Sequence, residues 1–153
     1  MYKRQVVCIR LHQLLDYAPL HQSCRQELST LDNIVHLSLV AVMTTLLPEY
    51  GSNQARYDLL VSQMRDALLR YASTVDMNDE LFMWAAFVGY ATVLPASDHA
   101  WLMQLVNEMC VCSIIRSWEE VRTTLCQYAW IGVFYDKAGL QTFQQASRLE
   151  KLA

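Results

Sequence analysis

The chain has 153 residues, about one domain at the usual ~100–200 residues per domain, and it is 54 % hydrophobic and 18 % charged. That composition excludes a disordered chain, since an average soluble domain has roughly 45–50 % apolar and ~25 % charged residues. Only 4 Gly and 3 Pro are present, too few for the tight turns of a β-sandwich or barrel, so long helices are indicated. A formal net charge of −3 argues against a nucleic-acid-binding surface.

The first five residues have an unusual coding pattern. Residues 1–5 read Met-Tyr-Lys-Arg-Gln, which GTG-TAT-AAG-AGA-CAG encodes when GTG is the start codon. Those bases are similar to the end of a transposase-based sequencing adapter, so we interpret residues 1–5 as an artefact and expect the natural protein to continue upstream. A genuine basic N-terminus is the alternative. Without Lys3 and Arg4, the 12 basic residues become 10 against 15 acidic ones, and the net charge becomes −5.

Residues 6–31 form a weakly patterned helical lead-in, for which we predict short helices at 11–15 and 20–31, separated at Pro19. Stronger patterns occupy residues 32–153. Asp32 is the predicted N-cap of an apolar helix over 33–47, which ends at Pro48 and is followed by a turn at 51–53.

A clearly amphipathic helix is predicted over 54–72, and Asn78 is the predicted N-cap of an apolar helix that follows. The two most apolar stretches, 34–47 and 81–94, are each shorter than the ~20 residues that a membrane span needs. We therefore expect buried core helices and no membrane segment.

In the last third, Ser97 is the predicted N-cap of a helix over 98–112. Ser117 and Glu120 have the S-x-x-E spacing of a capping box, which predicts a helix from 118 to about 135. Gly139 is expected to separate that helix from a final one over 140–152. The predicted fold is an all-α, single bundle-like domain of five to seven helices, and we expect it to be a fragment of a larger helical domain.

The sequence offers no catalytic, cofactor-binding or metal-binding residue that we would assign. The cysteines are odd in number and form no C-x-x-C pair, so we expect small buried side chains. They are Cys8, Cys24, Cys110, Cys112 and Cys126. His36 is predicted to be a hydrogen-bonded core histidine and His99 a solvent-facing one. The acidic pairs at 79–80 and 119–120 are interpreted as helix starts, where carboxylates favour the helix dipole.

The four tryptophans lie in the second half. Trp84, Trp101 and Trp130 are expected to pack in the core. For Trp118 two roles stay open, because it can pack over the preceding helix or anchor a partner.

Several of these residues carry a family resemblance. The order Leu-Phe-Met-Trp at 81–84, Phe-Val-Gly at 87–89 and Trp-Leu at 101–102 is followed by Ile-Arg-Ser-Trp-Glu-Glu-Val-Arg at 115–122. Leu125, Tyr128 and Trp130 complete the series. Residues 78–130 thus resemble the C-terminal portion of the fungal-specific transcription factor domain, which occurs in regulators with a Zn2Cys6 DNA-binding module.

The resemblance implies a helical regulatory domain over 32–153, acting in the nucleus through protein partners or a regulatory effector, with a homodimer as one possible assembly. It implies no enzyme activity and no cofactor in this segment. Zinc and DNA would be bound by an upstream domain with six closely spaced cysteines, which this sequence does not contain. The alternative function is a stand-alone helical small-ligand-binding protein or enzyme, with a pocket between the Trp-bearing helices.

Overall fold

The computed structural model describes residues 2–20, 28–46, 57–74 and 79–152, and in these ranges it contains seven α-helices and no strand. The helices are α1 (Tyr2–Tyr17), α2 (Thr30–Thr45), α3 (Asp58–Ala72), α4 (Glu80–Thr92), α5 (His99–Cys112), α6 (Trp118–Leu125) and α7 (Gly132–Leu152), with a short 3-10 helix, η2, at Ala96–Asp98. The predicted all-α bundle is confirmed.

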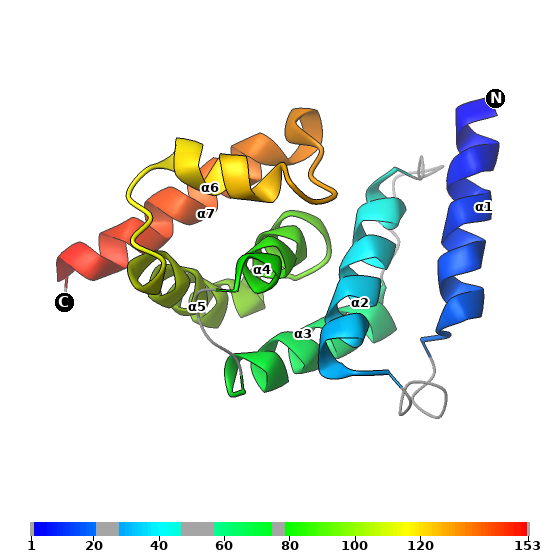
Figure 1. The fold of residues 1–153 in the computed structure, drawn as a ribbon, viewed down its shortest axis with the longest axis horizontal. Coiled ribbons are helices and arrows are strands. Elements are labelled where there is room, and N and C mark those ends of the chain that lie inside the picture. The colour runs from blue at the N-terminus through cyan, green and yellow to red at the C-terminus, as the bar shows by residue number, and fades with distance from the viewer. Residues whose placement is uncertain (1, 21–27, 47–56, 75–78, 153) are drawn as a thin grey trace.

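The centre of the bundle is α4, which packs against α2, α3, α5, α6 and α7 (Figure 1). All eight residues from 82 to 89 are buried, because this helix is apolar around almost its whole circumference. Its neighbour α2 contributes Ile34 and Leu37, both fully buried. The prediction that both apolar stretches form core helices is confirmed. Within the described residues, no helix is both long and apolar enough to cross a bilayer.

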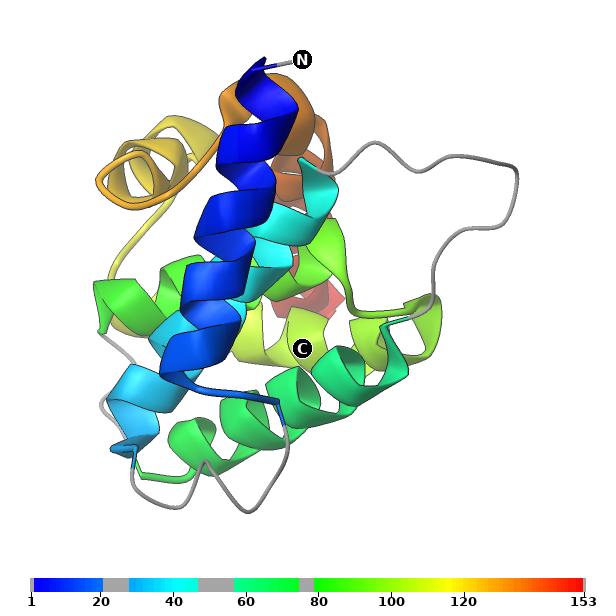
Figure 2. The ribbon, with the colours of Figure 1, turned by 90° about the vertical axis from the view of Figure 1, so that its right-hand side faces the viewer.

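The N-terminal helix α1 lies at the edge of the bundle and packs along α2 (Figures 1 and 2). The short helix expected at 11–15 is part of a longer one over residues 2–17, which includes most of the segment interpreted as an artefact. Most of the second expected helix, at 20–31, lies outside the described residues. The packing of α1 on α2, through the partly buried Leu11, Leu14 and Leu15, outweighs the weak sequence pattern. The helix ends just before Pro19, as predicted, because the residue before a proline disfavours helical backbone.

The predicted cap of α2 is wrong by one turn. Ser29, not Asp32, is the N-cap, and its hydroxyl accepts the Asp32 N–H at 3.0 Å. The Asp32 carboxylate in turn accepts the Ser29 hydroxyl at 2.7 Å. Serine and aspartate both favour helix starts. Because Asp32 lies three residues after Ser29, the two side chains pair as in a capping box and Ser29 takes the N-cap position. The predicted stop at Pro48 and the turn at 51–53 lie outside the described residues.

Helix α4 is capped by Asp79, whose carboxylate accepts the N–H groups of Leu81 and Phe82 at 2.9 and 3.2 Å. The predicted cap Asn78 lies outside the described residues, as do residues 54–56 at the predicted start of α3. The prediction that Ser97 is the N-cap of α5 is wrong. Ser97 lies exposed inside η2, and α5 begins only at His99, because Asp98 turns inward.

The segment predicted as one helix over 118–135 is two helices, α6 and α7, joined by a loop at 126–131. The loop is fixed by two indole donors: Trp84 Nε1 donates to the Ala129 carbonyl at 3.2 Å, and Trp130 Nε1 donates to Asp136 at 2.9 Å. The first contact joins residues 45 positions apart, which local patterning does not reveal, whereas the second joins residues 6 positions apart across the loop and the start of α7. The predicted break at Gly139 is also wrong, since α7 continues through it.

Candidate functional site

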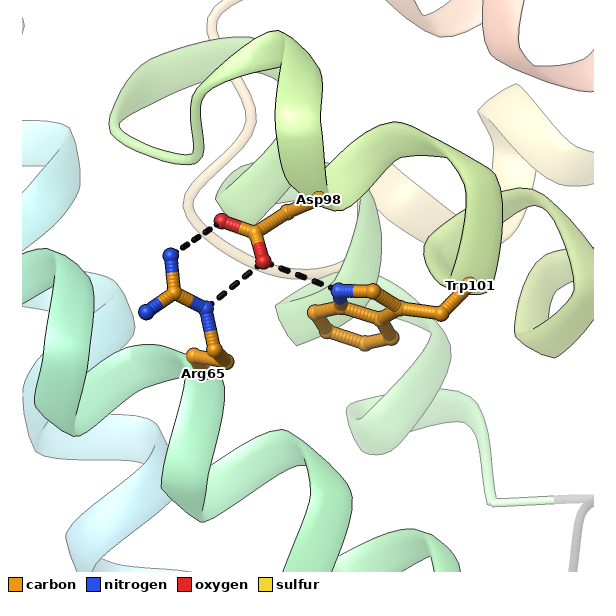
Figure 3. A network of polar contacts seen from close by, with 3 residues as sticks. All are labelled: Arg65, Asp98 and Trp101. Atoms are coloured by element: carbon orange, nitrogen blue, oxygen red, sulfur yellow. Dashed lines mark hydrogen bonds and ion pairs between the residues drawn. The ribbon is translucent and has the colours of Figure 1, made fainter.

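One partly buried polar network connects α3 to the start of α5 (Figure 3). Asp98 is only 5 % exposed, and both of its carboxylate oxygens accept from Arg65, at 2.6 Å from Nε and 2.6 Å from the terminal nitrogen. Trp101 Nε1 donates to the same carboxylate at 2.9 Å. A buried carboxylate is tolerated when it is paired and hydrogen-bonded in this way.

The network shifts the pKa values of both charged partners in the direction that keeps each of them ionised. The pKa of Asp98 is lowered, chiefly by the hydrogen bond from Arg65, with the Trp101 bond acting in the same direction against the effect of burial. The pKa of Arg65 is raised, chiefly by its hydrogen bond to Asp98. A carboxylate held ionised by three donors is poorly suited to proton transfer near neutral pH. The network therefore serves to fix η2 and α5 against α3.

The aromatic residues of the family-like motif gather where α4, α6 and α7 meet. Trp118 and Trp130 both contact α7 at Gly139: a Cβ there would lie 2.5 Å from Trp118 Cη2 and 3.1 Å from Trp130 Cζ2. Phe87 of α4 completes the group, with ring centroids 6.3 and 6.4 Å from the two indoles. Trp118 thus packs against Phe87 of α4 and Gly139 of α7, and its side chain remains half-buried.

The capping box at the start of α6 forms in a modified way. The Ser117 hydroxyl accepts the Glu120 N–H at 3.3 Å, as predicted. The Glu120 carboxylate accepts the backbone N–H of Arg116, at 2.8 Å, so it reaches one residue beyond the N-cap. This arrangement fixes both the loop before α6 and the position of Glu120.

Beside this capping box is a surface hollow of about 380 Å³, between the start of α4, the end of α5 and α6. Its lining combines apolar side chains, two hydroxyls and two carboxylates. The lining residues are Glu80, Met83, Ser113, Ile114, Ile115, Glu120 and Thr124. Met83, Ile115 and Glu120 belong to the segments that carry the family resemblance, although the first is more than 30 residues from the others in the sequence.

Ile114, on the lining of this hollow, has a left-handed backbone with φ of 57°. It follows the C-cap Ser113 in a Schellman motif, in which Ile115 N–H donates to the Cys110 carbonyl at 2.9 Å and Ile114 N–H to the Val111 carbonyl at 3.2 Å. Glycine is the usual residue at this position, because a left-handed backbone costs a residue with a Cβ about 1–2 kcal/mol. The side chain that bears this cost is 72 % exposed.

The predicted roles of the histidines and cysteines are confirmed only in part. His36 is buried, and its Nε2 donates to the Leu14 carbonyl at 2.6 Å, as a core histidine should. His99 is half-buried and stacks on Tyr90 with ring centroids 4.3 Å apart, so its solvent-facing placement is wrong. Of the four cysteines that the structure describes, only Cys110 is buried. The other three are Cys8, Cys112 and Cys126; Cys24 lies outside the described residues.

The acidic pairs occupy helix starts as predicted, but two of their members also share the hollow, which sequence spacing does not indicate. The core placement of Trp84 and Trp130 is confirmed, while Trp101 is partly buried and hydrogen-bonded to Asp98. The Arg65–Asp98 pair was not anticipated, because 33 residues separate its members and neither position has a local signal.

Across the part of the chain that the structure describes, no group of three or more His, Cys, Asp or Glu side chains is arranged to hold a metal ion. The comparisons with known proteins identify no relative: no family model, no curated protein and no solved structure matches this chain.

Proposed function

We propose that this chain is the helical regulatory and interaction domain of a fungal transcription factor, acting in the nucleus through protein partners or an effector. The observation that carries the proposal is the meeting of the family-like segments around one hollow. Met83 of α4, Ile115 of the loop before α6 and Glu120 of the first turn of α6 line it together. A hollow between helices is a usual place for a ligand or partner to bind and change the arrangement of a helical domain.

In this proposal the chain contributes regulation, and DNA contact belongs to an upstream Zn2Cys6 domain. The acidic net charge agrees with this division, because phosphate contacts need clustered Lys and Arg. The upstream genomic sequence tests the arrangement directly. Six cysteines at zinc-cluster spacing beside a basic stretch would support it, and the same sequence would show whether native codons replace residues 1–5.

A reporter experiment tests the activity itself. The full chain is fused to an unrelated DNA-binding domain in yeast, and transcription from a reporter is compared with that of the DNA-binding domain alone. We expect the fusion to change reporter output. Thr124→Trp, which fills the hollow from α6, should remove the change, whereas Thr123→Trp on the exposed side of the same helix should retain it. A stably expressed fusion with unchanged output would contradict the proposal.

The alternative, a stand-alone small-ligand-binding protein, is favoured by the size of the hollow. Its volume of about 380 Å³ falls among ligand cavities of about 300–1,000 Å³. An in-frame start near residue 6 without an upstream DNA-binding domain would favour this alternative.

A further inference from the structure

We infer that α1 is a releasable helix, which swings away from α2 about its anchored C-terminal end while α2 to α7 stay folded. Graded burial along α1, a single packing partner and an anchor at one end support this assignment. The release deepens the proposed function, because it names the helix that moves, and it rests on that function only for the consequence of the movement.

The burial of α1 increases toward its C-terminal end. All the side chains that the structure describes from residue 5 to residue 10 are exposed, including Ile9 at 56 %. Full burial is reached only at Ala18, directly after the helix, which is 2 % exposed. Three leucines between these two positions are partly buried, namely Leu11, Leu14 and Leu15. The N-terminal half of α1 therefore loses little contact area when the helix leaves α2.

The packing of α1 differs from that of the other described helices, because it packs closely on only one of them, α2 (Figures 1 and 2). None of its described side chains is fully buried, whereas every other helix contributes buried side chains to the core. The two ion pairs found in the described residues, Arg65–Asp98 and Arg122–Asp136, also leave α1 out. An element with so few buried contacts can open at low free energy while the rest of the fold is retained.

The anchor lies where the chain leaves α1. The Leu20 carbonyl, three residues after the helix, accepts a hydrogen bond from Nε2 of Gln63 on α3. Together with the buried Ala18, this contact attaches the C-terminal end of α1 to the bundle through a helix other than α2. Release from α2 therefore turns α1 about this end and leaves the end itself in place.

His36 of α2 reports whether α1 is docked. Its Nε2 donates to the Leu14 carbonyl at 2.6 Å, and its ring lies beside Tyr17, with ring centroids 6.2 Å apart. With α1 in place, His36 is only 4 % exposed. Release removes the Leu14 contact and uncovers the imidazole, whereas Trp84 in the core helix α4 keeps its hydrogen bond to the Ala129 carbonyl. These two side chains separate movement of α1 from unfolding of the bundle.

In the proposed function, the release changes how an upstream domain is held. Such a domain would be joined to the N-terminal end of α1, so its position relative to the bundle would follow that helix. A partner or effector that favours docked or released α1 would shift the population of the two arrangements. The release thus supplies the conformational change through which a regulatory domain acts.

The test is amide hydrogen exchange of the full chain at pH 7, together with NMR of the His36 imidazole and the Trp84 indole. After correction for intrinsic rates, amides at 6–17 should exchange at least about 100-fold faster than those of α4. The reason is that a 16-residue helix released from α2 is only marginally stable in water. Equal protection of α1 and α4, or a solvent-exposed His36 in the parent protein, would overturn the inference.

Matched variants link the two measurements. Leu14→Gln keeps a good helix former but removes part of the apolar contact with α2, so α1 should open about 3- to 10-fold more often. The His36 resonance should then move toward its solvent-exposed position while the Trp84 resonance stays. Ile9→Gln, the same kind of change at an exposed position of α1, should alter neither resonance and should not speed exchange.

Two other outcomes would also overturn the release. Faster exchange of α1 in Leu14→Gln without a change at His36 would indicate fraying of the helix alone. Equal changes at His36 and Trp84 would indicate that the whole bundle is destabilised. Neither measurement uses DNA or a reporter, so their failure leaves the reporter test of the proposed function standing, and failure of the reporter test leaves the release standing.

Discussion

Replacing Gly139 by alanine tests the packing of the motif tryptophans on α7. In an exposed helix interior this change would stabilise by about 0.8–1 kcal/mol through helix propensity. Here the new methyl group would lie 2.5 Å from Trp118 and 3.1 Å from Trp130. The nearest atoms belong to rigid indole rings, which cannot move aside as the end of a flexible side chain can. Overpacking of this kind costs about 1–3 kcal/mol. Because the first distance is far inside van der Waals contact, we expect a net loss of about 1–2 kcal/mol.

Thermal and urea unfolding measure this effect. A loss of about 1–2 kcal/mol lowers the Tm of a chain of this size by about 2–8 °C. Gly89→Ala is the matched control in α4, since its Cβ would meet flexible side-chain ends, of which Leu94 Cδ1 at 3.0 Å is the nearest. It should be at least as stable as the parent protein. Trp118→Leu should relieve part of the Gly139→Ala cost in the double variant. If Gly139→Ala matches or exceeds the parent stability, the close contact is refuted.

Three further predictions concern polar groups. Asp98→Asn should lower the free energy of unfolding by about 1.5–3 kcal/mol, and by less where solvent screens the partly exposed Arg65. The pKa of Asp98 is lowered from 3.8 in the folded protein. The difference in unfolding free energy between parent and variant, measured in urea, should therefore be present above pH 3.8 and disappear as the pH falls through the folded pKa. Ser117→Ala should cost about 0.5–2 kcal/mol while Ser117→Thr retains the cap, and an unchanged midpoint for the alanine variant would refute the helix start. Burial and the hydrogen bond to Asp79 raise the pKa of Tyr71 from 10.0 to about 12, so the stability linked to its neutral phenol should be lost as the pH rises from about 10 to 12. Tyr71→Phe should lack this loss in alkaline unfolding curves. In the parent protein, the Cζ resonance of Tyr71 identifies the titrating group.

The exposed isoleucine in the α5–α6 loop shows why the candidate site could be predicted only in part. The S-x-x-E spacing at Ser117 is local, and it correctly located the start of α6 and the capping role of Glu120. The predicted helices end at 112 and begin at 118, which leaves a short connection between them, but nothing in the sequence shows that Ile114 takes a left-handed backbone there. Glycine is the usual local signal for such a backbone, and its absence concealed the motif.

What the sequence determined by itself is the set of helices with continuous apolar faces. The stretches at α2 and α4 are core helices, because burying their surface removes the largest apolar area from water, whatever packs against them. The scarcity of Gly and Pro likewise determined the all-α class. These are properties of short segments, so reading along the chain is sufficient to find them.

Only the tertiary structure decided where α6 ends and which residues share the hollow. The loop at 126–131 depends on indole hydrogen bonds to Ala129 and Asp136, and α7 continues through Gly139, where two tryptophan rings lie close to the glycine. Such contacts link residues far apart in sequence, or residues whose geometry depends on neighbouring helices. Glu80 and Glu120 are 40 positions apart, and the packing of α4 beside α6 is what places them on one hollow.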